Sequence, residues 1–200
     1  MAKIYFVRHG EVDNPEKLIY GRLPGFGLTK LGEKQAQQAA EYLLSLKAKP
    51  EIIITSPLLR TKSTAEIIVQ FFPKIKLVEE KAIIEGNLDW EGKREADLIK
   101  KGIWDVYLNF PSKIKTGETF LGIQQRAVSW LKNCLEKKDY QEYVVVSHKD
   151  VIRGLTVFLE GRLLDDLVKV PCDFASITTV VFGKELRLLE PVSYWEPATS

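Results

Sequence analysis

Short apolar runs alternate along the chain with longer stretches in which apolar residues return every three or four positions. The runs are rich in β-branched and aromatic residues and predict buried strands over 3–7, 51–55, 75–78 and 143–147. The helical spacing predicts helices that begin near residues 31, 58, 120 and 151, with a weaker one over 96–101. Strands and helices therefore alternate through most of the chain.

Two helix starts carry recognisable signals. Thr29 precedes the first helix as a candidate N-cap, because its hydroxyl can accept a hydrogen bond from a free backbone N–H. Ser56 is the candidate N-cap of the second helix, with Pro57 at the first helical position. This start would place Arg60 in the first helical turn, next to the end of the preceding strand.

The C-terminal region departs from the alternation. Residues 177–182 and 185–189 flank Gly183-Lys184, a two-residue loop typical of a hairpin. The whole pattern predicts an α/β fold in one domain over 1–200: a three-layer sandwich with a mostly parallel sheet, helices on both faces and an antiparallel strand near the C-terminus. No repeat, low-complexity tract or linker divides it.

Composition narrows the function. The 200 residues are 45% hydrophobic, enough for one sizeable core, and a formal net charge of +2 argues against nucleic acid or membrane partners. The N-terminus enters a strand directly without a signal peptide, so we expect a cytoplasmic protein. Cys134 and Cys172 lack the spacing of a metal or redox motif, and with two histidines no zinc site of N and S ligands can be built.

Four residues of complementary chemistry follow predicted strands. Arg8 and His9 end the first strand, Arg60 follows the second, and His148 follows the strand over 143–147. Each alone is ordinarily a structural histidine or a solvated arginine. Because ligands of open α/β sheets bind beyond the carboxyl ends of the strands, we expect the four to meet there.

Together these residues suit phosphoryl transfer. Guanidinium groups bind a phosphomonoester dianion in bidentate fashion, and fixed cations supply the charge stabilisation that this reaction needs. Two arginines and a protonated histidine would take the place of Mg²⁺. An imidazole between such cations has a lowered pKa, stays neutral near pH 7 and can attack phosphorus.

Five motifs carry a family resemblance. They are RHG at 8–10, LTKLG at 28–32, SPLLRTKSTAE at 56–66, GET at 117–119 and SH at 147–148. RHG alone recurs by chance, but the ordered set from about residue 4 to 179 is specific. It resembles the histidine phosphatase and phosphoglycerate mutase superfamily.

The resemblance implies that His9 is the phosphorylated nucleophile and that Arg8, Arg60 and His148 bind the phosphoryl oxygens. It also implies that no cofactor and no metal take part. The expected partner is a small phosphorylated metabolite. The sequence does not decide whether the protein forms a homodimer.

Glu85 is the general acid that the resemblance implies, and Asn14 is a further phosphate ligand. The segment after Glu85 is one residue shorter than is usual in the family, so Glu80 and Asp150 are its rivals. Glu80 follows the predicted strand over 75–78, and Asp150 follows the one over 143–147, so both lie near a strand end. The sequence therefore leaves the acid open among three carboxyl groups.

Two further cations are candidate substrate ligands. Lys149 stands where the family commonly has glycine and would add positive charge, although a solvated lysine is an equal alternative. Arg22 would reach a substrate carboxylate or second phosphate, against the alternative of an exposed, flexible arginine.

The activity expected from these residues is metal-independent phosphomonoester hydrolysis through a phosphohistidine. One alternative is a phosphoglycerate mutase. The mutases of the family that the chain resembles are generally longer, which favours hydrolysis here. A second is a phosphate-binding scaffold without turnover, which the intact set of His9, Arg8, Arg60 and His148 disfavours.

Overall fold

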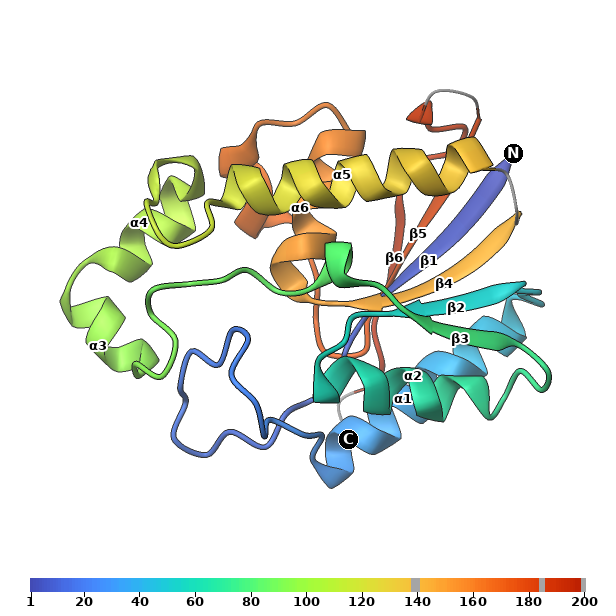
Figure 1. The fold of residues 1–200 in the computed structure, drawn as a ribbon, viewed down its shortest axis with the longest axis horizontal. Helices are drawn as coiled ribbons and strands as arrows, with labels where there is room; N and C mark the ends of the chain where they lie inside the picture. The colour runs from blue at the N-terminus through green and yellow to red at the C-terminus, as the bar shows by residue number, and fades with distance from the viewer. Residues whose placement is uncertain (138–140, 184–185, 199–200) are drawn as a thin grey trace.

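The computed structural model describes residues 1–137, 141–183 and 186–198. Its centre is a six-stranded sheet in the order β3-β2-β4-β1-β5-β6 (Figure 1). The strands are β1 (Ala2–Arg8), β2 (Ile52–Thr55), β3 (Lys76–Glu79), β4 (Glu142–Ser147), β5 (Ile177–Phe182) and β6 (Ser193–Trp195). Strands β1 to β4 pair in parallel, whereas β5 pairs antiparallel with β1 and β6 with β5. The predicted mixed sheet is confirmed.

Helices cover both faces of this sheet. They are α1 (Lys30–Ser45), α2 (Leu59–Val69), α3 (Glu95–Lys100), α4 (Ile103–Asn109), α5 (Phe120–Lys137) and α6 (Lys149–Leu159). Helices α1 and α2 lie on one face, α5 and α6 on the other, and α3 and α4 project beyond the sheet (Figure 1). The three layers are those that the sequence predicts.

The alternation of side chains along β1 divides the core in two. Ile4 and Phe6 pack into the cluster that includes α5 and α6. Tyr5 and Val7 point the other way, into the cluster that includes α1 and α2. All four side chains are at most 1% exposed, so β1 is covered on both faces. A strand buried in this way fixes the position of the residue that follows it.

The second helix begins later than predicted. Its N-cap is Leu58, without a side-chain cap, and the hydroxyl of Thr61 donates to the carbonyl oxygens of Leu58 and Ser56. Ser56 as the N-cap was therefore wrong. Its hydroxyl lies instead 2.7 Å from Nε2 of His148, a partner 92 residues away.

The C-terminal hairpin also differs from the prediction. Lys184 and Glu185, which would form its loop and begin its second strand, lie outside the described residues. Leu188 makes one isolated antiparallel bridge with Phe182. The strand that pairs with β5 is β6, whose Trp195 stacks on Tyr42 of α1 at a ring-centroid distance of 4.3 Å.

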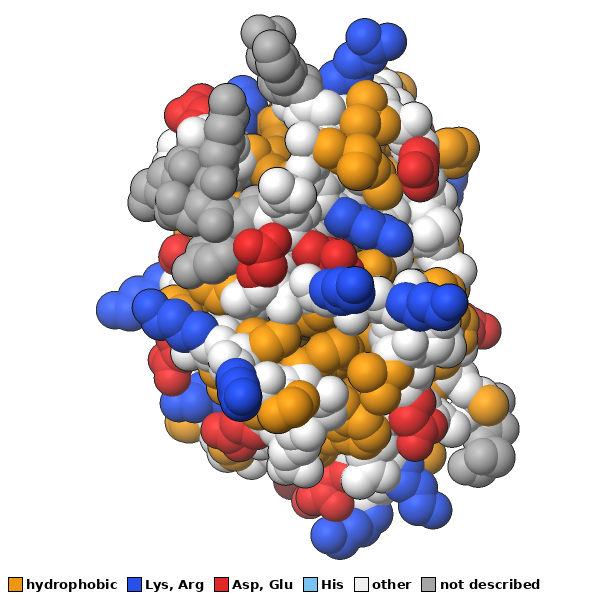
Figure 2. Space-filling model, turned by 90° about the vertical axis from the view of Figure 1, so that its right-hand side faces the viewer, with side chains coloured by type: hydrophobic (Ala, Val, Ile, Leu, Met, Phe, Trp, Pro, Cys, Tyr) orange, Lys and Arg blue, Asp and Glu red, His pale blue; other side chains and the backbone are white. Residues whose placement is uncertain are grey.

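The two ends of the molecule differ in character. Figure 2 shows the end at the amino termini of the parallel strands, where cationic and anionic side chains are interspersed around hydrophobic ones. The opposite end carries α3, α4 and the long connection over residues 14–28 (Figure 1). None of the described helices is long and apolar enough to cross a membrane.

Candidate active site

His9 follows β1 in a turn that is held on both sides. Its N–H donates to the carbonyl of Ser147 at 3.1 Å, and its own carbonyl accepts from the N–H of Ala175 at 3.1 Å. The next residue must be glycine, because a Cβ on Gly10 would lie 2.3 Å from the carbonyl oxygen of Gly32. The backbone that carries His9 therefore has little freedom to move.

The imidazole of His9 has a defined proton position. Nδ1 lies 2.9 Å from the carbonyl oxygen of Gly10, which only accepts hydrogen bonds, so Nδ1 carries the proton and Nε2 keeps its lone pair. Burial lowers the pKa of His9 well below its usual value, and the cations of Arg60 and Arg8 lower it further. The ring is neutral near pH 7 and presents a free nucleophilic nitrogen.

Two arginines flank this ring. Arg8 lies with its guanidinium carbon 3.9 Å from the ring centre of Phe174. Arg60, in the first turn of α2, is 1% exposed and donates to the carbonyl of Gly21 at 2.7 Å. In the described part of the chain the Nε atoms of both arginines are buried without a hydrogen-bond partner. Each arginine is thus anchored by one side and keeps a free donor.

His148 lies directly after β4, with its ring centre 5.4 Å from that of His9. Its Nε2 is 2.7 Å from Oγ of Ser56, and its Nδ1 has no hydrogen-bond partner among the described residues. Burial, with Arg60 next in effect, lowers its pKa well below the usual value. The lowered pKa favours the neutral ring, whereas a protonated one was expected from the sequence.

Glu85 lies beside His148, with its carboxyl oxygen Oε2 3.9 Å from Nδ1 and its side chain 12% exposed. Burial raises the pKa of Glu85 to about 7, and the carboxylate of Asp150 adds to the increase. Of its rivals, Glu80 caps the short 3₁₀ helix at Lys81–Ile83. Asp150 lines the pocket, and its carboxylate accepts from the hydroxyl of Tyr107 at 2.9 Å.

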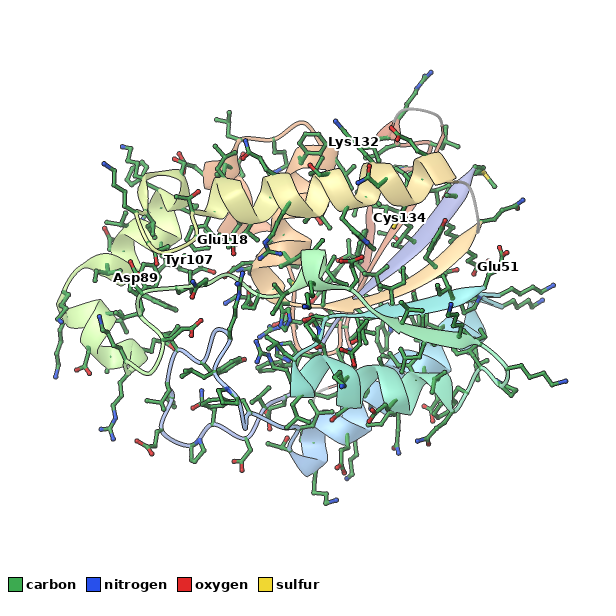
Figure 3. All side chains as sticks on the ribbon, viewed as in Figure 1. Glu51, Asp89, Tyr107, Glu118, Lys132 and Cys134 are labelled. Carbon is green, nitrogen blue, oxygen red and sulfur yellow. The ribbon has the colours of Figure 1, made fainter. Side chains whose placement is uncertain are left out.

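A half-buried ion-pair network holds the segment that carries Glu85. The backbone carbonyl of Glu85 accepts from Nε of Arg22 at 2.7 Å and from Arg126 at 3.2 Å. Glu118 pairs with both arginines, at 2.7 and 2.6 Å. Figure 3 shows Glu118 near Tyr107 at the end of the molecule that carries α3 and α4. Sequence reasoning missed this network because its members lie far apart in the chain: Arg22 and Glu118 are separated by 96 residues.

The contacts of Arg22 bear on its predicted role. Its side chain is half-buried, pairs with the carboxylate of Glu118 and donates to the backbone carbonyl of Glu85. The alternative of an exposed, flexible arginine is therefore wrong. It does not line the pocket that contains His9. Its assignment as a substrate ligand stays a prediction, and the observed contacts give it a positioning task.

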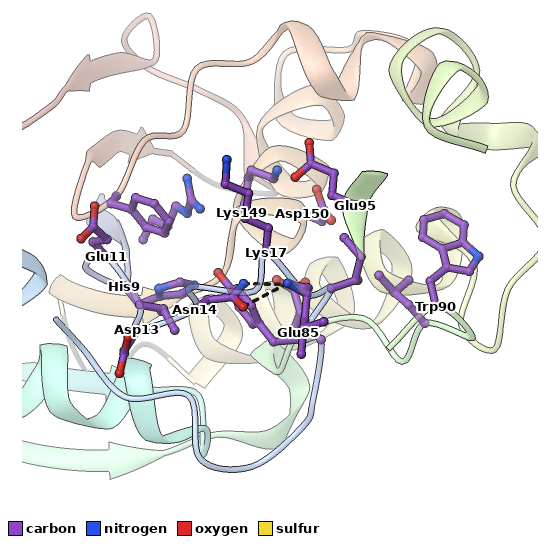
Figure 4. A pocket seen from close by; sticks show the side chains of 18 of the residues that line it. His9, Glu11, Asp13, Asn14, Lys17, Glu85, Trp90, Glu95, Lys149 and Asp150 are labelled. Atoms are coloured by element: carbon purple, nitrogen blue, oxygen red, sulfur yellow. Dashed lines mark hydrogen bonds between the residues drawn. The ribbon is translucent and has the colours of Figure 1, made fainter. Parts of the chain in front are cut away.

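A pocket of about 640 Å³ opens from His9. Figure 4 shows its lining, with His9 and Trp90 at opposite ends. Asn14 lines it, but the amide exchanges two hydrogen bonds with the backbone of Leu18, at 2.9 and 3.0 Å. Lys149 also lines it, and burial lowers the pKa of this lysine. The roles of Asn14 and Lys149 stay predictions.

Candidate metal ligands do not gather in the described part of the chain. No group of three or more His, Cys, Asp or Glu side chains lies there in an arrangement that would hold a metal ion. The cationic groups around His9 are supplied by side chains. The site thus joins a nucleophilic imidazole, two anchored arginines and a carboxyl group of raised pKa.

A buried imidazole between two arginines at the carboxyl ends of parallel strands defines the class of this protein. The chain belongs to the histidine phosphatase superfamily (branch 1), whose family model matches residues 4–192. This membership confirms the resemblance seen in the sequence and supports the predicted enzyme class, a phosphoric monoester hydrolase.

The names of similar proteins refer to two activities, phosphatase and mutase. A putative phosphoserine phosphatase 2 of Hydrogenobacter thermophilus is 30% identical over 90% of this chain and 89% of that protein. A probable phosphoglycerate mutase of Escherichia fergusonii is 32% identical over 82% of this chain and 80% of that protein. Among solved structures, a mycobacterial glucosyl-3-phosphoglycerate phosphatase in complex with VO3 has a TM-score of 0.85 at 22% identity and covers 99% of this chain and 100% of its own. The last likeness concerns the fold alone.

Proposed function

We propose that the protein hydrolyses phosphomonoesters without a metal ion, through a phosphohistidine at His9. The observation that carries the proposal is the set of buried donors around the free Nε2 of His9. Nε of Arg8, Nε of Arg60 and Nδ1 of His148 all lack a partner among the described residues. Buried donors without acceptors are costly, and the oxygens of a phosphoryl group would satisfy all three.

In the first step, Nε2 of His9 attacks phosphorus in line with the ester oxygen. The N–P bond forms while the P–O bond to the alcohol breaks, and Glu85 gives its proton to the departing oxygen. A pKa of about 7 suits this task, since a useful fraction of the carboxyl group is then protonated at neutral pH. The guanidinium groups of Arg8 and Arg60 stabilise the charge on the phosphoryl oxygens.

In the second step, the Glu85 carboxylate takes a proton from a water molecule that attacks the phosphohistidine. The N–P bond breaks, inorganic phosphate leaves and His9 returns to its neutral form. The reversal of roles at Glu85, acid and then base, restores the enzyme without an external proton carrier.

Ser56 gives His148 its direction in this scheme. Its Oγ lies 2.7 Å from Nε2 of His148. We assign the proton of the neutral ring to Nδ1, with the Ser56 hydroxyl donating to Nε2, so that Nδ1–H can donate to a phosphoryl oxygen; in the protonated ring Nε2–H donates to Oγ of Ser56 instead. The arrival of the phosphate dianion raises the pKa of His148, because an opposite charge favours the protonated ring. The protonated His148 expected from the sequence then belongs to the substrate complex.

The decisive experiment is a rapid mixing with a phosphomonoester, followed by quenching and peptide mapping. The proposal requires a phosphoryl group on His9 that survives alkali and is lost in acid, as expected for a phosphoramidate. His9→Ala should show neither adduct nor turnover while keeping its fold by circular dichroism. An acid-stable adduct, or one on another residue, would contradict the nucleophile assignment.

The same preparation tests metal independence. Activity should be unchanged after dialysis against EDTA, because Arg8, Arg60 and His148 supply the charge that a metal would bring. Activity that returns only with added Mg²⁺, Mn²⁺ or Zn²⁺ would overturn this part of the proposal.

The relationship to a probable phosphoglycerate mutase makes mutase activity the second candidate. Such an enzyme would convert 3-phosphoglycerate to its 2-phospho isomer with 2,3-bisphosphoglycerate as primer. We expect hydrolysis in place of isomerisation. Retained phosphate binding with no turnover on any ester would favour the scaffold instead.

A further inference from the structure

We infer that the substrate is a phosphomonoester of an uncharged, bulky apolar or aromatic alcohol, and that the wall of the pocket beyond His9 selects it. This inference rests on the proposed function, since it concerns the same pocket. It sets the protein apart from the relatives whose names refer to phosphoserine or phosphoglycerate. Three properties of the wall carry it: its apolar surface, its satisfied polar groups and its charge.

The wall opposite the phosphate end is mostly apolar and aromatic. It is formed by side chains from the connection after β1, the segment after Glu85, α4 and the start of α5. These are Leu18, Ile19, Leu88, Trp90, Trp104, Tyr107 and Phe120. The rings of Trp104 and Tyr107 lie 5.2 Å apart, and those of Tyr107 and Phe120 lie 5.4 Å apart. Trp104 is half-buried, whereas Tyr107 and Phe120 are 4% and 1% exposed and pack behind it. An apolar group that contacts the accessible part of Trp104 would be removed from water.

Several polar side chains of the pocket lining are already paired within the protein. The amide of Asn14 is engaged by the backbone of Leu18, and the hydroxyl of Tyr107 donates to Asp150. Thr29 donates to Glu11 and accepts from the N–H of Gly32. A sugar or polyol would have to break these bonds or leave its own hydroxyls unpaired, and either costs free energy.

The charges of the lining disfavour a second anionic group on the substrate. Three lining residues are cationic: Arg8, Lys17 and Lys149. Five are acidic: Glu11, Asp13, Glu85, Glu95 and Asp150. Arg8 belongs to the phosphate end, and Lys149 lies near enough to Asp150 and Glu85 for both to act on its pKa. The carboxylate of phosphoserine or phosphoglycerate would therefore meet more acids than available cations.

The size of the pocket agrees with a large alcohol. Its volume of about 640 Å³ lies within the range of sites that enclose drug-sized ligands. A three-carbon phosphate ester bound at His9 would fill only a small part of this volume. An aromatic group of two fused rings would fill more of it while the phosphate reaches His9.

The test compares alkyl phosphates, so that the leaving alcohols differ little in acidity. We expect kcat/KM for 2-(1-naphthyl)ethyl phosphate to exceed that for ethyl phosphate and for 3-phosphoglycerate by roughly 10- to 100-fold, mainly through KM. Trp104→Ala should reduce this ratio towards one. The control Phe110→Ala, which removes an exposed ring outside the pocket, should keep the ratio.

A second variant covers the case in which Trp104→Ala does not fold. Glu95 lines the pocket and is half-buried in the first turn of α3, so Glu95→Lys adds a cation with little change in packing. It should raise kcat/KM for 3-phosphoglycerate relative to the naphthylethyl ester. Preference for 3-phosphoglycerate or phosphoserine in the wild type would overturn the inference and leave the phosphatase standing. No hydrolysis of any ester would instead remove the proposed function itself.

Discussion

At the scale of single residues, the surroundings of Glu85 favour the protonated form of its carboxyl group, as its proposed role requires. Its side chain is largely withdrawn from water, and the neighbouring carboxylate of Asp150 opposes its ionisation. Arg22 and Arg126 donate hydrogen bonds to the backbone carbonyl of Glu85 and so fix the position of this residue. Position and pKa are thus set by different neighbours.

Glu85→Gln should separate substrates by their need for a proton. We expect a loss of roughly 10²- to 10⁴-fold in kcat on alkyl phosphates, the usual contribution of a positioned acid. The loss should be much smaller on p-nitrophenyl phosphate, whose leaving group needs little protonation. Asp150→Asn serves as the comparison. Equal losses for Glu85→Gln on the two esters would mean that Glu85 positions substrate and donates no proton.

The same group predicts a pH dependence. Because the acid must be protonated and its pKa is about 7, kcat/KM for an alkyl phosphate should fall as the pH rises above about 7. In Glu85→Gln this decline should be missing. A wild-type profile that stays flat from pH 6 to pH 9 would argue against Glu85 as the acid.

At the scale of elements, the site depends on how closely α1 approaches the turn after β1. A Cβ on Gly32, in the first turn of α1, would lie 2.1 Å from the carbonyl oxygen of Glu11. Glu11 also accepts from the hydroxyl of Thr29, the residue that caps the helix. The helix start and the turn that carries His9 are therefore one packed unit.

Gly32→Ala should disturb stability and catalysis together. Forcing α1 away from the turn should lower the free energy of unfolding by about 1–3 kcal/mol, as overpacking does, and should lower kcat because the turn carries His9. The control is Gly27→Ala, where the new Cβ would meet a side-chain atom of Leu59 at 3.6 Å. Urea denaturation and steady-state kinetics measure both effects. Equal stability of the two variants would show that the close approach is not needed.

Local signals predicted the elements that depend on local contacts. Thr29 does accept a hydrogen bond from the N–H of Gly32, and the four parallel strands lie where their apolar runs indicated. The prediction for Ser56 was wrong because the Ser-Pro pair is a local signal, whereas its Oγ lies 2.7 Å from Nε2 of His148, a histidine that follows β4. Helix α4 was missed because Ile103–Asn109 contains β-branched and aromatic residues that have weak helix propensity.

Local signals also predicted part of the candidate site, namely the residues that follow the strands. Arg8, His9, Arg60 and His148 adjoin strand ends, and strand topology brings such ends together. The contacts of Arg22 with Glu118 and Glu85 depend on three segments folding together, and nothing in the local pattern indicates them. The positions of the wall side chains could not be predicted, because α4 and the connection after β1 lack a regular period.

At the scale of the whole molecule, the raised pKa of Glu85 has a cost in stability. The unfolded chain releases this proton near pH 4.5, while the folded protein keeps it until about pH 7. Stability therefore declines across this interval, and the penalty is complete above about pH 7. At 1.36 kcal/mol for each pKa unit it amounts to roughly 3 kcal/mol.

Glu85→Gln should remove that penalty. The variant should gain stability over the wild type at pH 8, with the gain shrinking to nothing towards pH 4. Thermal unfolding across this range measures it, with Glu136→Gln, a substitution at an exposed position of α5, as the control. A constant difference for Glu85→Gln would mean that its carboxyl group ionises normally in the folded protein.

The two ends of the pocket rest on different kinds of scaffold. His9 is clamped by backbone hydrogen bonds to Ser147 and Ala175 at the centre of the sheet, whereas the aromatic wall comes from connections and short helices. Substitutions in connections usually disturb a fold less than substitutions in a central strand. Substitutions in the wall can therefore change the substrate specificity of a related protein one side chain at a time, while the residues at the strand ends keep the same reaction.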